Sequence, residues 1–196
     1  MSELFSIQLQ NRQQQGRDGV WLDLPTTTEQ VQAALRQIGI SSDNLQGLFI
    51  SGYFAEEEKR FAISYNMVLA SNVDELNFLA SRLETLSTGE RAELNAALQA
   101  PQSELFSIGR ITDFPENVDY YVHLPDVHGP AQLGDYYLNR SGMVDMPEEW
   151  KGGIDTAQFG RYVAQQEQGV FTQYGYLVKS GDKWQKVHEG QPVPEE

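Results

Sequence analysis

The chain has 196 residues, of which 40% are hydrophobic, a share that suits a folded core and argues against gross disorder. Asp and Glu number 28 against 14 Lys and Arg, which gives a formal net charge of −14. Such an excess of acid argues against nucleic acid or an anionic membrane as the direct partner. It is compatible with a basic partner and equally with plain solubility.

The sequence contains no cysteine, so disulfides and thiolate chemistry are excluded. The first ten residues lack the basic region and the apolar run of a signal peptide. No stretch approaches the roughly 20 apolar residues that a membrane-spanning helix needs. The expected location is therefore the cytoplasm.

The first part of the chain predicts an α+β subdomain over residues 1–70. Apolar and polar residues alternate over 3–10, and strands are also expected at 20–24 and 48–54. Between the last two, a capping box at Thr26–Glu29 and an apolar stripe predict a helix that Gly39 ends. The apolar run at 61–69 predicts a fourth strand or an extended loop.

The strongest local signal lies at residues 72–100, within a central helical subdomain expected over 71–101. Apolar residues recur there at intervals of three and four, which is typical of one buried helix face. Asn72 with Glu75, and Ser87 with Glu90, have the spacing of N-terminal caps. We therefore expect two helices with a break near Ser87–Gly89.

The remaining residues, 102–196, are expected to form a C-terminal α+β subdomain. The hexapeptide of residues 2–7 recurs letter for letter at 103–108, which suggests an internal duplication of a small β–β–α unit; six identical residues can also be coincidence. Strands are expected at 118–124 and 170–178, and a helix around 131–139. Asp145 and Asp155 have the position of helix caps, and the tail from Lys179 is expected to be frayed or loosely docked.

The residues that usually carry catalysis or bind metal form no convincing site. His123 and His128 lie five residues apart in a strand-to-loop segment without a cysteine, so metal binding is disfavoured. Nucleophile-elbow, SxxK, P-loop and dinucleotide-binding motifs are absent from the sequence. We expect neither an enzyme nor a cofactor.

The acids are distributed through the expected folded elements rather than gathered in one tail. A rigid negative surface of this kind can complement a basic groove built for nucleic acid. Duplex DNA carries one charge per about 1.7 Å of axis, a density that one helix does not reach, so several elements would have to contribute. The acids expected on this surface are Asp23, Glu29, Asp74, Glu75, Glu84, Glu90, Glu93, Glu116, Asp119, Asp126, Asp135, Asp145, Glu148, Glu149 and Asp155.

Three stretches make the chain resemble the ArdA-type antirestriction proteins carried by conjugative plasmids and transposons. The first is Trp21–Pro25, and the second begins at Asn72 and continues through Leu83. The third corresponds to the family's antirestriction motif, with Ala157 and Tyr162 at positions that are usually acidic. Its matching residues are Val144, Pro147, Glu148, Ile154, Asp155, Phe159, Gly160 and Arg161.

The resemblance implies an elongated α+β chain of three small subdomains that dimerises through its C-terminal part. The residue pattern itself indicates two β–β–α-type units flanking the central helical pair. It also implies a mimic of bent DNA that occupies the DNA-binding groove of type I restriction–modification enzymes. Their DNA-binding subunits would be the partner, with no direct binding of nucleic acid. The alternative is an acidic interaction or regulatory scaffold that does not imitate DNA.

Overall fold

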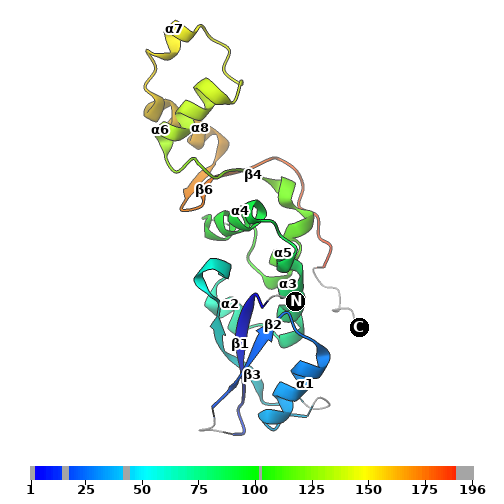
Figure 1. Ribbon diagram of the computed structural model, residues 1–196. Coiled ribbons are helices and arrows are strands. Elements are labelled where there is room, and N and C mark those ends of the chain that lie inside the picture. Colours follow the sequence, from blue (N-terminus) through cyan, green and yellow to red (C-terminus); the bar gives the residue numbers. More distant parts are fainter. Residues whose placement is uncertain (1–2, 15–17, 42–44, 102, 189–196) are drawn as a thin grey trace. The chain divides into compact units, whose positions relative to one another are not determined.

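The computed structural model describes residues 3–14, 18–41, 45–101 and 103–188. It confirms the α+β class, because two three-stranded antiparallel sheets occur together with numerous helices (Figure 1). The chain divides into two compact units. The first is Met1–Leu86, Leu105–Pro115 and Lys186–Glu196, and the second is Ser87–Glu104 and Glu116–Gln185. The expected division into three subdomains stays a prediction.

The first unit is built on a sheet whose strands are ordered β2-β1-β3. The strands are β1 (Phe5–Asn11), β2 (Val20–Leu24) and β3 (Leu48–Phe54), and all three were expected from the sequence. Alternation places Ile7 and Leu9 in the core, where both are fully buried. Ile7 pairs with Leu22 across the antiparallel β1–β2 ladder, so one sheet face is apolar.

Helices of the first unit cover this sheet and extend its core. They are α1 (Thr28–Gln37), α2 (Tyr65–Leu69), α3 (Val73–Glu84) and α5 (Ile108–Thr112), with a 3-10 turn η1 (Glu57–Lys59) and a second, η2 (Phe114–Glu116), that ends in the second unit. The predicted apolar stripe of α3 is confirmed, since Leu76, Leu79 and Leu83 are fully buried. The predicted cap is confirmed as well: the Asn72 side chain accepts a hydrogen bond from the Glu75 backbone N–H at 2.8 Å.

Two local predictions for the first unit are wrong. The capping box of α1 joins Thr27 to Gln30, one residue later than expected, because the helix begins at Thr28. The apolar run at 61–69 forms no strand: residues 61–64 are a loop, which agrees with the alternative prediction, but residues 65–69 form the helix α2. A short apolar run does not distinguish a strand from a buried helix, and α2 buries Val68 by packing against β3.

The second unit combines a small sheet with a group of helices. Its sheet is ordered β4-β6-β5, from β4 (Tyr121–Leu124), β5 (Val170–Thr172) and β6 (Gly175–Lys179). Its helices are α4 (Thr88–Gln99), the 3-10 turn η3 (Val118–Tyr120), α6 (Pro130–Asp135), the π-helical turn η4 (Tyr136–Arg140), α7 (Glu148–Lys151) and α8 (Thr156–Glu167). The predicted capping box of α4, Ser87 with Glu90, is confirmed.

Three predictions for the C-terminal half are corrected. The second copy of the hexapeptide forms no strand, because Ser107 caps α5 instead. Residues 170–178 form the hairpin β5–β6 rather than one strand, since the chain reverses before Gly175, which has a φ of 118°. Pro147, not Asp145, stands at the N-cap of α7.

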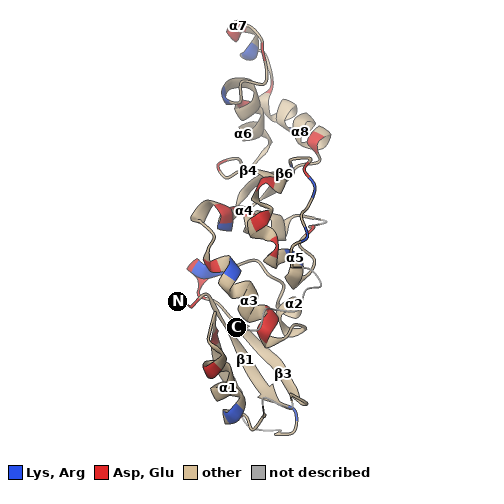
Figure 2. Ribbon diagram, turned by 90° about the vertical axis from the view of Figure 1, so that its right-hand side faces the viewer, with Lys and Arg blue, Asp and Glu red and all other residues tan. Residues whose placement is uncertain are grey.

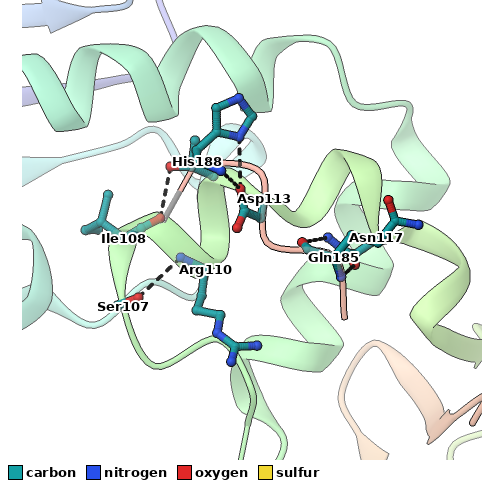
Figure 3. A network of polar contacts seen from close by, with 8 residues as sticks. Ser107, Ile108, Arg110, Asp113, Asn117, Gln185 and His188 are labelled. Atoms are coloured by element: carbon teal, nitrogen blue, oxygen red, sulfur yellow. Dashed lines mark hydrogen bonds and ion pairs between the residues drawn. The ribbon is translucent and has the colours of Figure 1, made fainter. Parts of the chain in front are cut away.

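The chain after β6 is docked rather than frayed in its described part; residues 189–196 lie outside the described residues. Figure 3 shows His188 over the buried carboxylate of Asp113, which accepts a hydrogen bond from the His188 backbone N–H at 2.7 Å. The ring Nδ1 of His188 lies 2.9 Å from the same oxygen. Buried carboxylates need such donors to offset their desolvation. None of the helices formed by the described residues has both the length and the apolar character that crossing a membrane requires.

Candidate functional site

Two glycines allow α6 and α8 to approach each other closely in the second unit (Figure 1). A Cβ atom added to Gly134 on α6 would lie 1.9 Å from the carbonyl oxygen of Thr156. A Cβ atom added to Gly160 on α8 would lie 1.9 Å from the carbonyl oxygen of Pro130. Only glycine tolerates such backbone contacts. Gly160, expected within the antirestriction motif, therefore has a packing role.

The other motif residues extend from the loop before α7, through the start of α7, to the first half of α8. Asp155 caps this helix by accepting a hydrogen bond from the Gln158 backbone N–H at 2.9 Å, which confirms its expected role as a cap. Its carboxylate remains at the surface, because the residue is exposed. Of the rest, Val144, Ile154 and Phe159 are partly buried, whereas Pro147 and Arg161 are exposed.

Ten of the fifteen expected surface acids lie in the second unit. They come from α4, η2, η3, the loop after β4, the end of α6, the loop before α7, α7 itself and the cap of α8. Seven are exposed: Glu116, Asp119, Asp126, Asp145, Glu148, Glu149 and Asp155. Figure 2 shows acidic positions on many separate elements rather than on a single helix.

Ion pairing neutralises only some of these carboxylates. Asp135 lies 2.8 Å from Arg140, and its pKa is lowered first by a hydrogen bond from Asn139 and then by Arg140. Glu148 lies 2.6 Å from the Lys151 ammonium group.

Asp145, Glu149 and Asp155 form no ion pair with any Lys or Arg that the structure describes. The segment from Asp145 to Asp155 thus presents three carboxylates that form no ion pair with the described residues. These charges are available to a basic partner.

Glu93 differs from the other acids because burial suppresses its charge. This partly buried carboxyl on α4 has its pKa raised to about 8, chiefly by desolvation and then by Glu90 and Asp119. At pH 7 the group is mostly protonated. Glu90 behaves oppositely, since hydrogen bonds from Ser87 lower its pKa. Glu93 is therefore the weakest contributor to a negative surface.

The remaining five acids lie in the first unit, away from the motif in sequence. Asp23 on β2 accepts a hydrogen bond from the Ser6 hydroxyl at 2.6 Å. Glu29 lies in the first turn of α1, and hydrogen bonds from its own backbone N–H and from Thr27 lower its pKa. Three more follow on α3: Asp74 is exposed, and Glu75 and Glu84 are partly buried.

No sequence pattern predicted a polar cluster that joins α8 to η4 and β6. Glu167, the last residue of that helix, accepts hydrogen bonds from the hydroxyls of Tyr137 and Tyr176, at 2.5 and 2.9 Å. Burial and this carboxylate raise the pKa of both phenols. Tyr176 is fully buried on β6, so its hydrogen bond to Glu167 connects α8 to the sheet and the cluster has a structural role. Among the described residues, no group of three potential ligands is arranged to hold a metal ion.

The family model described as antirestriction protein (ArdA) matches residues 15–178, which include the acids and the motif discussed above. The chain belongs to the ArdA family. It is accordingly an antirestriction protein, and ArdA proteins are inhibitors rather than enzymes. No curated protein matches the sequence.

The ArdA match covers the Trp21–Pro25 stretch, all of α3 and the segment around α7 and α8. The three stretches that carry the resemblance therefore fall inside one continuous family match. An ArdA protein acts by interacting with restriction enzymes, so the surface that meets the enzyme is the functional site to be identified.

Proposed function

We propose that the protein mimics DNA and competes for the DNA-binding groove of type I restriction–modification enzymes. Its carboxylates would stand in for phosphates and bind the Lys and Arg side chains of the enzyme's DNA-binding subunits. DNA would then be excluded by occupancy, without catalysis, cofactor or contact with nucleic acid.

The observation that supports this proposal is the set of exposed carboxylates in the second unit, of which Asp145, Glu149 and Asp155 form no ion pair with the described residues. Glu149 lies on α7 and Asp155 caps α8, so these two carboxylates are held by helical elements before binding, whereas Asp145 lies in the loop before α7. Preorganised charges of this kind favour association with a basic groove. The fifteen acids named above form the proposed surface, and Glu93 should contribute least.

Displacement of a labelled duplex from a purified type I enzyme tests the proposal. We expect the protein to displace DNA, with affinity falling as NaCl rises, because surface charges are screened over about 8 Å at physiological ionic strength. An inhibition constant that stays unchanged over a tenfold NaCl range would contradict the mechanism. Failure to displace DNA from type I enzymes, with co-purification of another protein, would favour the acidic scaffold.

Charge substitutions locate the surface. Glu148→Lys and Glu149→Lys should each weaken inhibition modestly, by roughly three- to tenfold, because the contacts are distributed. Glu58→Lys is the charge-matched control, since Glu58 is exposed in η1 and outside the proposed surface. Glu93→Gln should leave inhibition at pH 7 unchanged. If one reversal abolished inhibition while the fold was retained, a discrete site would replace the distributed surface.

A homodimer formed through the C-terminal part belongs to the same proposal. Tyr162 lies exposed on α8 beside the motif, and Trp150 on α7 is 67% exposed. Large exposed apolar side chains are typical of surfaces that a protein partner covers. Sedimentation of the full chain should show a dimer that Tyr162→Ala weakens. A monomer at every concentration would exclude the proposed homodimer. A cytoplasmic location and carriage on a mobile genetic element complete the proposal.

A further inference from the structure

A recess in the first unit is enclosed by Leu35 of α1, Ile50 of β3 and Val73 at the start of α3, together with neighbouring residues. Its volume is about 400 Å³, within the range of sites for small molecules. Every described residue that lines the recess belongs to the first unit. The recess is therefore separate from the acidic segment around α7 and α8.

The buried residues of the recess are apolar, and its exposed residues are mostly polar. Leu35 and Ile50 are each 5% exposed, and Val73 is 6% exposed. Thr28 and Gln32 also line the recess and lie at the surface. A ligand that enters from solvent would thus transfer its apolar part from water onto apolar side chains, which is favourable.

One stripe of α1 supplies both kinds of surface. Its members, at the spacing of a single helix face, are Thr28, Val31, Gln32 and Leu35. The side chains of Thr28 and Gln32 form no hydrogen bond with any residue that the structure describes. A hydroxyl and an amide are therefore available to a ligand beside the apolar side chain of Val31.

The volume of the recess limits its occupant to a small molecule. One turn of a helix, about 10 Å across and about 5.4 Å long, takes up about 420 Å³ and would fill the recess. A segment of another protein could insert no more than one turn or one side chain. A molecule of about two or three rings fits as a whole.

The lining of the recess carries little charge. Asp74, at the surface, is the one charged residue among the described residues that line it. An anion would meet no counter-charge there, on a chain whose formal net charge is −14. One exposed carboxylate strengthens the binding of a cation by no more than about fivefold. The other polar lining groups are amides and hydroxyls, which suit an uncharged ligand.

We propose that this recess binds an uncharged, mainly apolar small molecule that carries a hydrogen-bonding group. The apolar part of the ligand would lie against Leu35, Ile50 and Val73. Its polar group would lie beside Thr28 and Gln32. Because α1, β3 and α3 would all contact the ligand, binding would stabilise the first unit. This interaction does not depend on DNA mimicry.

The uncharged dye N-phenyl-1-naphthylamine tests the proposal on the full chain, because its fluorescence rises when it leaves water. We expect saturable binding of one molecule per chain. In ¹³C-methyl-labelled protein, the dye should shift the signals of Val31 and Val73, assigned with Val31→Ile and Val73→Ile, and leave that of Val170 in place. Absence of saturable binding, or saturable binding that shifts neither Val31 nor Val73, would overturn the proposal.

Charged relatives of the dye test whether the ligand is uncharged. The anionic 8-anilino-1-naphthalenesulfonate has the same rings and should bind at least about tenfold more weakly, because its charge would lose water without gaining a partner. Asp74→Asn should reduce this difference by about two- to fivefold. Equal binding of the anionic dye would overturn the proposal. Binding of the cationic N-(1-naphthyl)ethylenediamine more than about tenfold tighter than the uncharged dye would also overturn it.

Substitutions on α1 locate the ligand. Val31→Phe enlarges a side chain in the recess and should weaken binding of the uncharged dye at least tenfold. Ala33→Phe, on the same helix but outside this recess, is the control and should leave binding unchanged.

Gln32→Ala tests the hydrogen-bonding group and keeps the experiment decisive if Val31→Phe does not fold. Because Gln32 is exposed, its replacement should preserve the fold, which thermal unfolding verifies. Loss of the amide should weaken binding about two- to fivefold. Full binding by Gln32→Ala and by a folded Val31→Phe would place the dye elsewhere and overturn the proposal. If only Gln32→Ala folds, its full binding alone would have the same consequence.

Discussion

The same six residues, Ser-Glu-Leu-Phe-Ser-Ile, occur at 2–7 and at 103–108 and fold in two different ways. In the first copy, Phe5 begins strand β1, which continues through Ile7. In the second copy, Ser107 is the N-cap of helix α5. Identity over six residues therefore did not fix even the type of secondary structure.

The residues that follow each copy explain the difference. After Ile7 the alternation continues to Leu9, which is buried, so the strand gains a full apolar face. After Ile108 the next buried apolar residue is Ile111, three positions on, which is the spacing of a helix face. The elements that bury the apolar faces of β1 and α5 lie far away in sequence, so the hexapeptide by itself does not indicate them.

The phenylalanine of each copy should give the largest contrast. Phe5 is 3% exposed and packs against Tyr53 with ring centroids 5.4 Å apart, whereas Phe106 is 62% exposed. Phe5→Ala should lower the free energy of unfolding by about 3–5 kcal/mol. Phe106→Ala should lower the free energy of unfolding by only about 0.5–1 kcal/mol. It removes the contact between the ring and the Arg110 guanidinium, which lies 5.0 Å from the ring centre. Urea unfolding of the two variants measures both changes. Equal losses of unfolding free energy would contradict a buried Phe5 and an exposed Phe106.

The leucine should behave alike in both copies. Leu4 is 4% exposed and Leu105 is 2% exposed, although neither lies in a strand or a helix. Leu→Ala at each position should cost about 2–5 kcal/mol, because each leaves a cavity in the core of the first unit. The same denaturation experiment measures both variants. A loss below about 1 kcal/mol at either site would show that the copies differ there too.

Replacing Ser107 should lower the stability more than replacing Ser6, its counterpart in the first copy. Ser107 accepts a hydrogen bond from the Arg110 backbone N–H at 3.2 Å, so Ser107→Ala should cost about 1 kcal/mol as a lost helix cap. Ser6 donates a hydrogen bond to Asp23 at the surface, so Ser6→Ala should cost within about 0.5 kcal/mol. Ser107→Asp supplies the control, because it should restore the cap. If Ser107→Ala matched wild type, the cap would contribute nothing.

Replacing the glutamate, Glu3 in the first copy and Glu104 in the second, should give the smallest difference in stability. This difference should depend on salt and pH. Glu104 lies 2.7 Å from the Lys179 ammonium group and raises the pKa of Lys179 above its ordinary value of 10.5. A raised lysine pKa means that this stabilisation is present below pH 10.5 and is lost as pH rises through the folded-state pKa.

Glu104→Gln should therefore cost about 0.2–1 kcal/mol at neutral pH, less in 1 M NaCl, and nothing in strong alkali. Glu3→Gln, at the exposed matching position, should leave stability unchanged throughout. Unfolding measured across pH and salt compares the two. A Glu104→Gln effect that ignores both variables would mean that packing, not charge, accounts for it.

Local signals in the sequence were sufficient for several elements and for the family. The apolar spacing and the Asn72 cap predicted α3, and strands β2 and β3 were predicted with their observed bounds. Helices and caps depend on residues within one or two turns, so the sequence alone specifies them. The stretches that resemble ArdA are likewise continuous in sequence and lie within the family match.

Only the tertiary structure decided which acid lost its charge and that β2 would lie at the edge of its sheet. The pKa of Glu93 is raised, and its charge at pH 7 suppressed, by burial and by the charge of Asp119, which is distant from α4 in sequence. Strand β2 lies at the edge of its sheet, with α1 packed against it. Burial and strand order arise from contacts between distant segments, and these contacts have no signature in the local pattern of residues.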